Sequence, residues 1–247
     1  MHKVISYITI LVLLLSFGFL NETKAIIDST VINARIASDG TAQFGNVQRV
    51  LLRNTFSSSV RNEMYDVELQ ALYVYGEQAK LVTENDLLCN INMGIDTYEN
   101  SSVLLFGTYE SSRLRRIHHR YQIGVGPKYV FSNTISSHWT GSVVCLLDRT
   151  TFESSEELSS NRISLRIKGR QSIIEKKLIL STEMFYQPSL SDFSNDFRWR
   201  SNTRFEIPVS QSIAITSSFA YSYESITRLG RLSGDTAITF GFMVQLL

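Results

Sequence analysis

The 247-residue chain has few of the features that would place it in several common classes of protein. It contains only two cysteines and three prolines, and neither cysteine is spaced as a metal ligand. Its formal net charge of +1 provides no electrostatic basis for binding nucleic acid. After residue 25 there is no apolar run long enough for a membrane-spanning helix. No cofactor or metal site is therefore predicted.

The first 25 residues are predicted to be a cleaved secretory signal peptide. Lys3 supplies the positive charge, residues 4–20 form the apolar region, and Thr23-Lys24-Ala25 is a small-residue cleavage site. The apolar run approaches the roughly 17 to 20 residues needed to span a membrane, so an anchor is the alternative. A polar segment follows the run, which favours the signal peptide. The remainder, 26–247, is predicted to be one β-barrel domain.

The aromatic residues, 14 Phe and 11 Tyr, favour strands over helices, and polar and apolar residues alternate in short segments. Such alternation is typical of transmembrane barrels, and most segments exceed the roughly 9 to 11 residues that a tilted strand needs to cross hydrocarbon. The prediction is an all-β fold, a transmembrane antiparallel β-barrel of about 12 strands, with about 10 or 14 as alternatives. The segments are 30–38, 43–57, 63–75, 85–97, 102–111, 119–131, 138–151, 161–171, 176–186, 197–207, 212–224 and 235–247.

The connections between these segments alternate in length. Short periplasmic turns and longer external loops are expected of such a barrel, and an even strand number brings both termini to the periplasmic side. The first loop, around Ser38-Asp39-Gly40-Thr41, does not fit the alternation. The predicted external loops are 76–84, 152–160, 187–196 and 225–234, and the predicted periplasmic turns include 98–101, 172–175 and 208–211.

The last segment, 235–247, has bulky apolar residues at every second position. In a soluble sheet these residues would need a second layer to cover them, whereas a membrane strand is covered by lipid. The pattern Thr239-x-Gly241-x-x-Val244-x-Leu246 resembles the C-terminal signal by which outer-membrane barrels are recognised for insertion. This resemblance implies the barrel-assembly machinery as a partner during insertion. The alternative is an edge strand of a soluble sandwich.

Charged residues share one face of several predicted strands, as arginines do in 161–171 and 197–207. An arginine facing lipid near the midplane would cost roughly 2 to 4 kcal/mol, so these charges are expected to face the lumen. The lumen-lining candidates are Arg49, Arg53, Asp66, Glu68, Arg162, Arg166, Lys168, Arg170, Glu183, Arg198, Arg200, Arg204 and Glu206. Arg35 is expected to join them, and Asp96, Glu110 and Glu224 are further candidate acids.

Two interpretations of this lining remain open. The charges could form an ion-pair lattice that fills a narrow barrel, or they could line a pore that selects anionic solutes. Arg166 and Arg200 are expected to be held by acids on other strands. Gly124 and Gly126 also fall on the inward face, where they would make room for long basic side chains opposite or allow the sheet to bend. Cys89 and Cys145 are interpreted as small lipid-facing hydrophobes.

Several of these segments together resemble a known family. They occur in the order Phe44-Gly45-Asn46, Tyr109-Glu110-Ser-Ser-Arg113, the Gly-x-Gly strand 121–131, Asn161-Arg-Ile-Ser-Leu-Arg166 and the closing strand 235–247. The pattern is similar to a domain-of-unknown-function family described as salt-induced outer-membrane proteins, and it covers most of the chain after the signal peptide. The resemblance implies a Gram-negative outer-membrane barrel and supplies no catalytic residues.

An enzyme is the main alternative, since outer-membrane phospholipases are barrels of this size. A serine hydrolase would need a histidine oriented against a serine. Ser111, Ser112, His118 and His119 are close in sequence, but the run 111–120 is better interpreted as a basic external loop that contacts lipopolysaccharide phosphates. The prediction is thus a non-enzymatic, structural or small-solute barrel of the outer membrane, surrounded by its lipid and lipopolysaccharide. A membrane-embedded lipid hydrolase and a soluble periplasmic binder are the alternatives.

Overall fold

The computed structural model describes residues 30–43, 48–62, 64–98, 100–175, 177–227 and 232–246. The predicted signal peptide and its cleavage site therefore lie outside the described residues. In the described ranges, the chain forms twelve strands: β1 Val31–Gln43, β2 Arg49–Arg61, β3 Tyr65–Gln78, β4 Leu81–Tyr98, β5 Ser101–Ser112, β6 Ile117–Asn133, β7 Ser137–Phe152, β8 Glu157–Ile174, β9 Leu178–Pro188, β10 Phe197–Pro208, β11 Ile213–Glu224 and β12 Gly234–Gln245.

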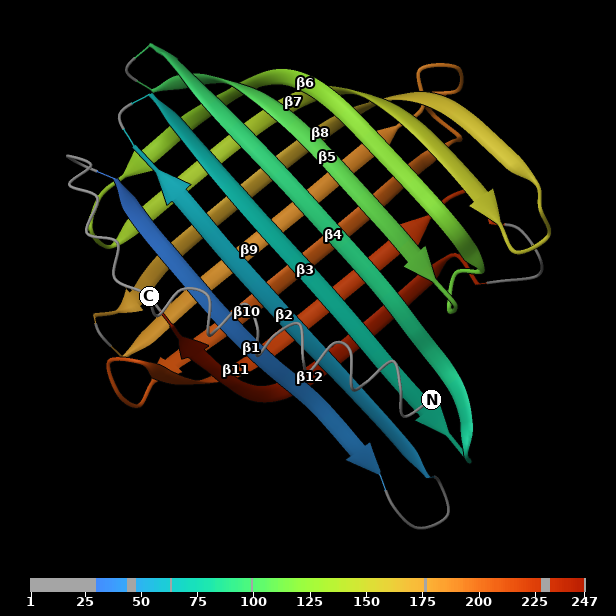
Figure 1. Ribbon diagram of the computed structural model, residues 1–247, viewed down its shortest axis with the longest axis horizontal. Coiled ribbons are helices and arrows are strands. Elements are labelled where there is room, and N and C mark those ends of the chain that lie inside the picture. The colour runs from blue at the N-terminus through green and yellow to red at the C-terminus, as the bar shows by residue number, and fades with distance from the viewer. Residues whose placement is uncertain are drawn as a thin grey trace, which may run out of the picture. The chain divides into compact units, whose positions relative to one another are not determined.

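These strands close into a single barrel in which each strand pairs antiparallel with its sequence neighbours (Figure 1). The first and last strands complete the ring, with Ala37 of β1 opposite Met243 of β12. The predicted all-β, twelve-stranded antiparallel barrel is confirmed. Nowhere in the described ranges is there a helix long and apolar enough to cross a bilayer.

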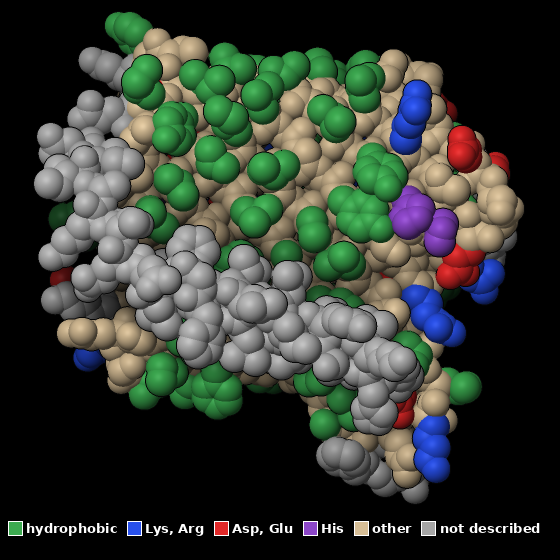
Figure 2. All heavy atoms as spheres, viewed as in Figure 1, with side chains coloured by type: hydrophobic (Ala, Val, Ile, Leu, Met, Phe, Trp, Pro, Cys, Tyr) green, Lys and Arg blue, Asp and Glu red, His purple; other side chains and the backbone are tan. Residues whose placement is uncertain are grey.

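The outer face of the barrel is apolar, as Figure 2 shows for one side. Large hydrophobic residues remain exposed at alternate positions, for example Trp199 at 37%, Phe205 at 41% and Ile207 at 50% on β10. Charged and histidine side chains gather toward one end of this view. An apolar outer band of this kind suits contact with lipid, because each exposed side chain would otherwise be left in water.

The first hairpin differs from the prediction. Residues 39–42, predicted as a loop, continue β1 to Gln43, and β2 begins at Arg49. The Ser-Asp-Gly-Thr composition resembles a turn, but Asp39 is 1% exposed and points into the barrel. There it accepts hydrogen bonds from Thr216 and Arg204, the latter at 2.8 Å. Buried partners on other strands thus override the local turn preference.

Predicted external loops are shorter than expected in three places. The predicted loop 152–160 is reduced to 153–156, between β7 and β8. Between β3 and β4 only Ala79 and Lys80 turn the chain, with φ of 49° and 66°, so the predicted loop 76–84 is wrong. Positive φ at both central residues is the geometry of the tight hairpin turns that match strand twist. The turn after β5 is 113–116, so the ends of the run 111–120, interpreted as a loop, lie on β5 and β6. The longest connections at this end of the barrel are 189–196 and 225–233, although 228–231 lies outside the described residues.

Candidate functional site: the charged interior of the barrel

The interior of the barrel holds ion pairs that join strands far apart in the ring. Lys168 on β8 contacts Glu68 on β3, and Arg200 Nη2 on β10 lies 2.6 Å from Glu110 Oε2 on β5. Strands that are not neighbours can meet in a closed barrel only across its interior. The structure therefore brings the side chains of opposite walls together inside the barrel.

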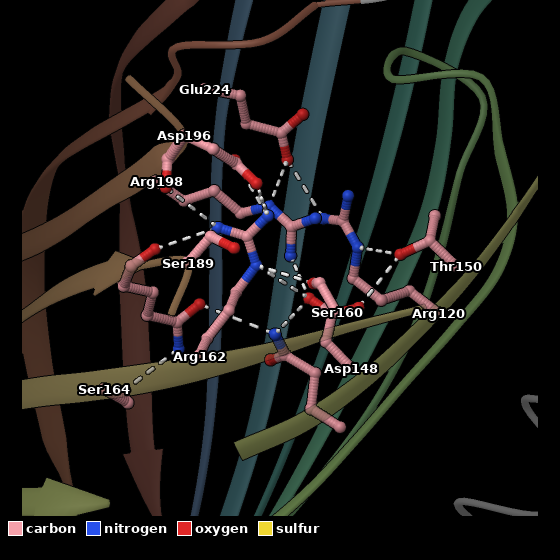
Figure 3. A network of polar contacts seen from close by, with 12 residues as sticks. Arg120, Asp148, Thr150, Ser160, Arg162, Ser164, Ser189, Asp196, Arg198 and Glu224 are labelled. Carbon is pink, nitrogen blue, oxygen red and sulfur yellow. Dashed lines mark hydrogen bonds and ion pairs between the residues drawn. The ribbon is translucent and has the colours of Figure 1, made fainter. Parts of the chain in front are cut away.

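One network lies toward the end of the barrel that carries the loop 189–196 (Figure 3). Arg120 Nη1 is 3.2 Å from Glu110 Oε2 and 3.0 Å from Glu224 Oε1, and the Arg120 side chain is 1% exposed. Arg198 contacts Asp148, and its Nε lies 3.7 Å from Glu224 Oε1. Cations and anions therefore alternate across β5, β6, β7, β10 and β11. Such alternation is needed because each buried charge would otherwise be strongly destabilising.

Arg162 joins this network to the loop 189–196. Its Nη2 donates to both carboxylate oxygens of Asp196, at 2.9 and 2.8 Å, and its Nη1 donates to the Gln187 carbonyl oxygen at 3.1 Å. The Arg162 Nε lies 3.5 Å from Asp148, and Ser189 forms a bridge with the Arg162 backbone. The bidentate contact fixes the loop against the inner wall.

A second network crosses the lumen between β3 and β8. Arg166 Nε donates to Glu183 Oε1 at 2.7 Å, and Arg166 Nη2 lies 3.8 Å from Glu68, which also contacts Lys168. The Lys168 side chain is 39% exposed and that of Glu68 is 28% exposed. This crossing is therefore far more hydrated than the contact between Arg120 and Glu110. On the β3 side, Lys128 Nζ lies 2.7 Å from Asp66 Oδ1.

The remaining candidates are held in smaller groups. Arg204 Nη2 donates to Asp39 at 2.8 Å, and Arg170 Nη1 donates to Glu206 Oε1 at 3.0 Å. Arg49 Nη2 donates to Glu84 Oε1 at 3.2 Å near the mouth. Among the described residues, Arg53 makes neither a hydrogen bond nor a contact ion pair.

Between these groups lies an interior cavity of about 440 Å³. It reaches from the β5–β6 turn, at Leu114 and Arg115, to Phe106 and Phe185. Arg53 and Arg200 line it from opposite walls. The barrel therefore has open interior space beside its ion pairs.

Sequence reasoning missed several members of these groups. Asp39 was assigned to a loop, Arg120 was interpreted as part of the basic run 111–120 and not as a lumen residue, and Asp148, Glu84 and Asp196 were not considered. Asp148 lies in phase with Thr150 along β7, so alternation within that strand could have placed it on the inward face. Asp196 gives no such signal, because it lies in a connection and reaches the interior only through Arg162.

The interpretation of the inward glycines needs a correction. A Cβ added to Gly124 would lie 2.5 Å from Leu146 Cδ2 and 2.6 Å from Val144 Cγ1. A Cβ at Gly126 would approach the Val143 carbonyl and lie 2.8 Å from Val144 Cα. The room at these glycines is therefore occupied by apolar side chains and backbone of β7, and the expectation of long basic side chains there is wrong.

Ser112 and His119, two of the residues considered for hydrolysis, lie on opposite faces of the barrel wall. Ser112 is fully buried on the inner side and donates to Asp86 Oδ2 at 2.8 Å. His119 Nδ1 lies 2.9 Å from the Tyr109 hydroxyl, and its ring packs beside Tyr121, which is 52% exposed on the outer face. Within the described part of the chain, no group of His, Cys, Asp and Glu is arranged to hold a metal ion.

The segment predicted as the insertion signal lies on β12 and just beyond it. Thr239 is 1% exposed on the inner side, while Val244 and Leu246 are exposed outside at 39% and 48%. A Cβ at Gly241 would lie 2.5 Å from Asp39 Cα, so this glycine allows β12 to approach β1 closely. Whether these residues are recognised for insertion stays a prediction.

The similarity to one solved structure, the NanC porin, supports the fold. The NanC porin is 11% identical over 87% of this chain and 100% of that chain, with a TM-score of 0.53. The KdgM porin is 8% identical over 87% and 98%, with a TM-score of 0.44, and an anion-selective porin from Comamonas acidovorans is 7% identical over 88% and 99%, with a TM-score of 0.40. No curated protein matches the sequence. A family model described as "Protein of unknown function, DUF481" matches residues 40–246, and the chain belongs to this family.

Proposed function

We propose that the protein is a non-enzymatic outer-membrane barrel that conducts small solutes, with anions preferred, through a lumen narrowed by ion pairs. The observation that carries this proposal is the interior cavity of about 440 Å³ beside charged groups from opposite walls. A barrel whose interior served only for stability would be filled, because native interiors leave few voids larger than a water molecule. The apolar outer band and the predicted signal peptide support a place in the outer membrane, in contact with its lipopolysaccharide.

The contact between Glu68 and Lys168 is the proposed constriction. It joins β3 to β8 across the lumen, and both side chains are partly exposed. Exposed ion pairs contribute roughly 0 to 1 kcal/mol, so this contact can open far more readily than the buried contacts of Arg120. Solute passage would therefore depend on it. The anion preference is supported by Arg53, the cation of the cavity wall that lacks a contact acid among the described residues.

Planar-bilayer conductance tests the proposal. The wild-type protein should give small current steps with a reversal potential that favours anions, and Glu68→Gln should enlarge the steps because it frees Lys168. Glu153→Gln is the matched control, since it makes the same chemical change at an exposed residue of the turn after β7. Absence of steps in the wild type and in Glu68→Gln would indicate a structural barrel. A phospholipid hydrolysis assay on the same preparation separates the channel from a lipid hydrolase.

A further inference from the structure

We infer that the interior cavity binds a small monocarboxylate with an apolar body, such as an aromatic or medium-chain acid. Arg53 would bind the carboxylate, and an apolar wall formed by Leu72, Val74, Leu88, Phe106 and Phe185 would contact the body. The inference names a solute class for the proposed channel and in that respect rests on the proposed function. Binding itself requires no conduction, so the two can fail separately.

An apolar wall is unusual inside a transmembrane barrel. The interior of a transmembrane barrel is ordinarily polar, because it faces water. Here all five wall residues border the cavity, and the rings of Phe106 and Phe185 lie with centroids 6.4 Å apart at 46°. Leu72, Val74 and Leu88 are half-buried and so keep part of their surface open. Water against this wall costs about 25 cal/mol per Å² of apolar surface, which an apolar solute would recover.

The wall rests on a packed support. Leu104, Val144 and Leu146 are 2 to 3% exposed and form one cluster with Phe106, against which Phe185 packs. The glycine positions of β6 admit Val144 and Leu146, as their close approach to Gly124 shows. The guanidinium carbon of Arg166 lies over the Phe185 ring, 5.3 Å from its centroid. The wall is therefore preformed, which lowers the cost of ordering it on binding.

Arg53 supplies the charge for the ligand. The other arginines that line the cavity are paired, Arg49 with Glu84 and both Arg115 and Arg200 with Glu110. Arg53 makes no contact ion pair among the described residues. A guanidinium presents a planar pair of donors that matches one carboxylate.

The acids near Arg53 are already engaged. Asp39 binds Arg204 and Thr216, and Asp86 accepts hydrogen bonds from the Ser112 hydroxyl and the Leu114 backbone N–H. Asp235 also lines the cavity, but it lies far from Arg53. In the sheet, Asp39 of β1 lies opposite Arg53 of β2 on one side and opposite Gly241 of β12 on the other. Asp235 precedes Gly241 by six residues, which is roughly 20 Å along β12. The free charge at Arg53 therefore favours a single negative group.

Size and polarity narrow the ligand class. A volume of about 440 Å³ is within the roughly 300 to 1,000 Å³ of known ligand pockets. A polyhydroxylated acid would leave the apolar wall wet, and an uncharged aromatic alcohol would leave Arg53 without a partner. Both features together select an anion with an apolar body.

Equilibrium binding of radiolabelled phenylacetate to the full protein in lipid nanodiscs tests the inference. Saturable binding is expected above that of empty discs, with competition by hexanoate and little competition by gluconate or 2-phenylethanol. Arg53→Gln should weaken binding about tenfold, as expected for loss of a hydrogen-bonded charge. Arg61→Gln, on the same strand but outside the cavity, should leave it unchanged.

Leu88→Gln tests the wall independently of Arg53 and should also weaken binding of phenylacetate. Folding of each variant is checked by heat-modifiable gel mobility. Absence of saturable binding, equal competition by gluconate, or unchanged affinity in folded Arg53→Gln or Leu88→Gln would overturn the inference. Liposome flux, measured separately, tests the channel. Binding without flux would support the binding site and contradict the proposed channel, whereas flux without binding would support the channel and contradict the binding site.

Discussion

Reversing the charge at Arg200 should destabilise the barrel strongly. Arg200 Nη2 lies 2.6 Å from Glu110 Oε2, and the Glu110 side chain is 1% exposed. Two unit charges about 4 Å apart interact by about 4 kcal/mol at an effective dielectric of about 20. Arg200→Glu removes this attraction and places a carboxylate beside Glu110.

The full Coulomb change will not be realised. Arg115 and Arg120 still contact Glu110, and the side chain at position 200 is 23% exposed, so a carboxylate there can turn toward the cavity. We expect a loss of about 3 to 5 kcal/mol in the free energy of unfolding, the range for breaking a buried pair. Arg200→Gln, which removes the charge but retains a donor, should lose about 1 to 2 kcal/mol.

Urea unfolding in lipid vesicles provides the assay. Trp139 and Trp199, the two tryptophans, report on the transition through their fluorescence. Arg49→Glu is the control, because the Arg49 side chain is 43% exposed and its reversal should cost clearly less. Planar-bilayer reversal potentials are measured in parallel, and a lining role predicts a shift toward cations. If Arg200→Glu changes neither stability nor selectivity, the assignment of this side chain to the interior is refuted.

The remaining predictions concern location, topology, the ordered loop and the inward glycines. The protein should fractionate with the outer membrane and show heat-modifiable mobility, and recovery in the soluble periplasm would contradict this. Protease added to intact cells should cut within 187–196 or 225–234 and spare 208–211, whereas external cleavage at 208–211 would invert the topology. Asp196→Asn should speed cleavage within 187–196 because Arg162 loses its charged partner in this loop, and an unchanged rate would show that this pair does not hold the loop. Gly126→Val should abolish or markedly destabilise folding, since even a Cβ meets β7 backbone, and a wild-type unfolding midpoint would contradict that packing.

The number of strands and the faces of β8 and β10 could be predicted because side chains alternate with a period of two along any strand. Such information is local. The pairing of charges is different, since it depends on which strands oppose each other across a closed ring. Glu110 illustrates this, because its partners Arg115, Arg120 and Arg200 come from the adjoining turn, the adjacent strand and the opposite wall.

The first hairpin shows how local signals can mislead. Asp39 and Gly40 resemble a turn when only their neighbours are considered. In the barrel, however, Asp39 accepts a hydrogen bond from Arg204 on β10. A Cβ at Gly40 would lie 2.8 Å from the Leu51 carbonyl oxygen of the paired strand. Asp39 is therefore explained by a contact remote in sequence, which only the closed sheet reveals, and Gly40 by the close approach of its hairpin partner.

The apolar wall follows from strands whose two faces are both apolar. On β5, Leu104 points inward at 2% exposure and Leu105 outward at 43%, and on β7 Leu146 and Leu147 differ in the same way, at 2% and 66%. Polarity cannot assign the face of such residues, but polar anchors on the same strand can. Glu110 and Asp148 cannot face lipid, and counting by two from them places Leu104 and Leu146 inside. β5 and β7 both have apolar residues on their two faces, and they lie on either side of β6 with its inward glycines. An apolar region of the interior can therefore be inferred where two such strands, each with its facing fixed by an inward charged residue, flank a strand with inward glycines.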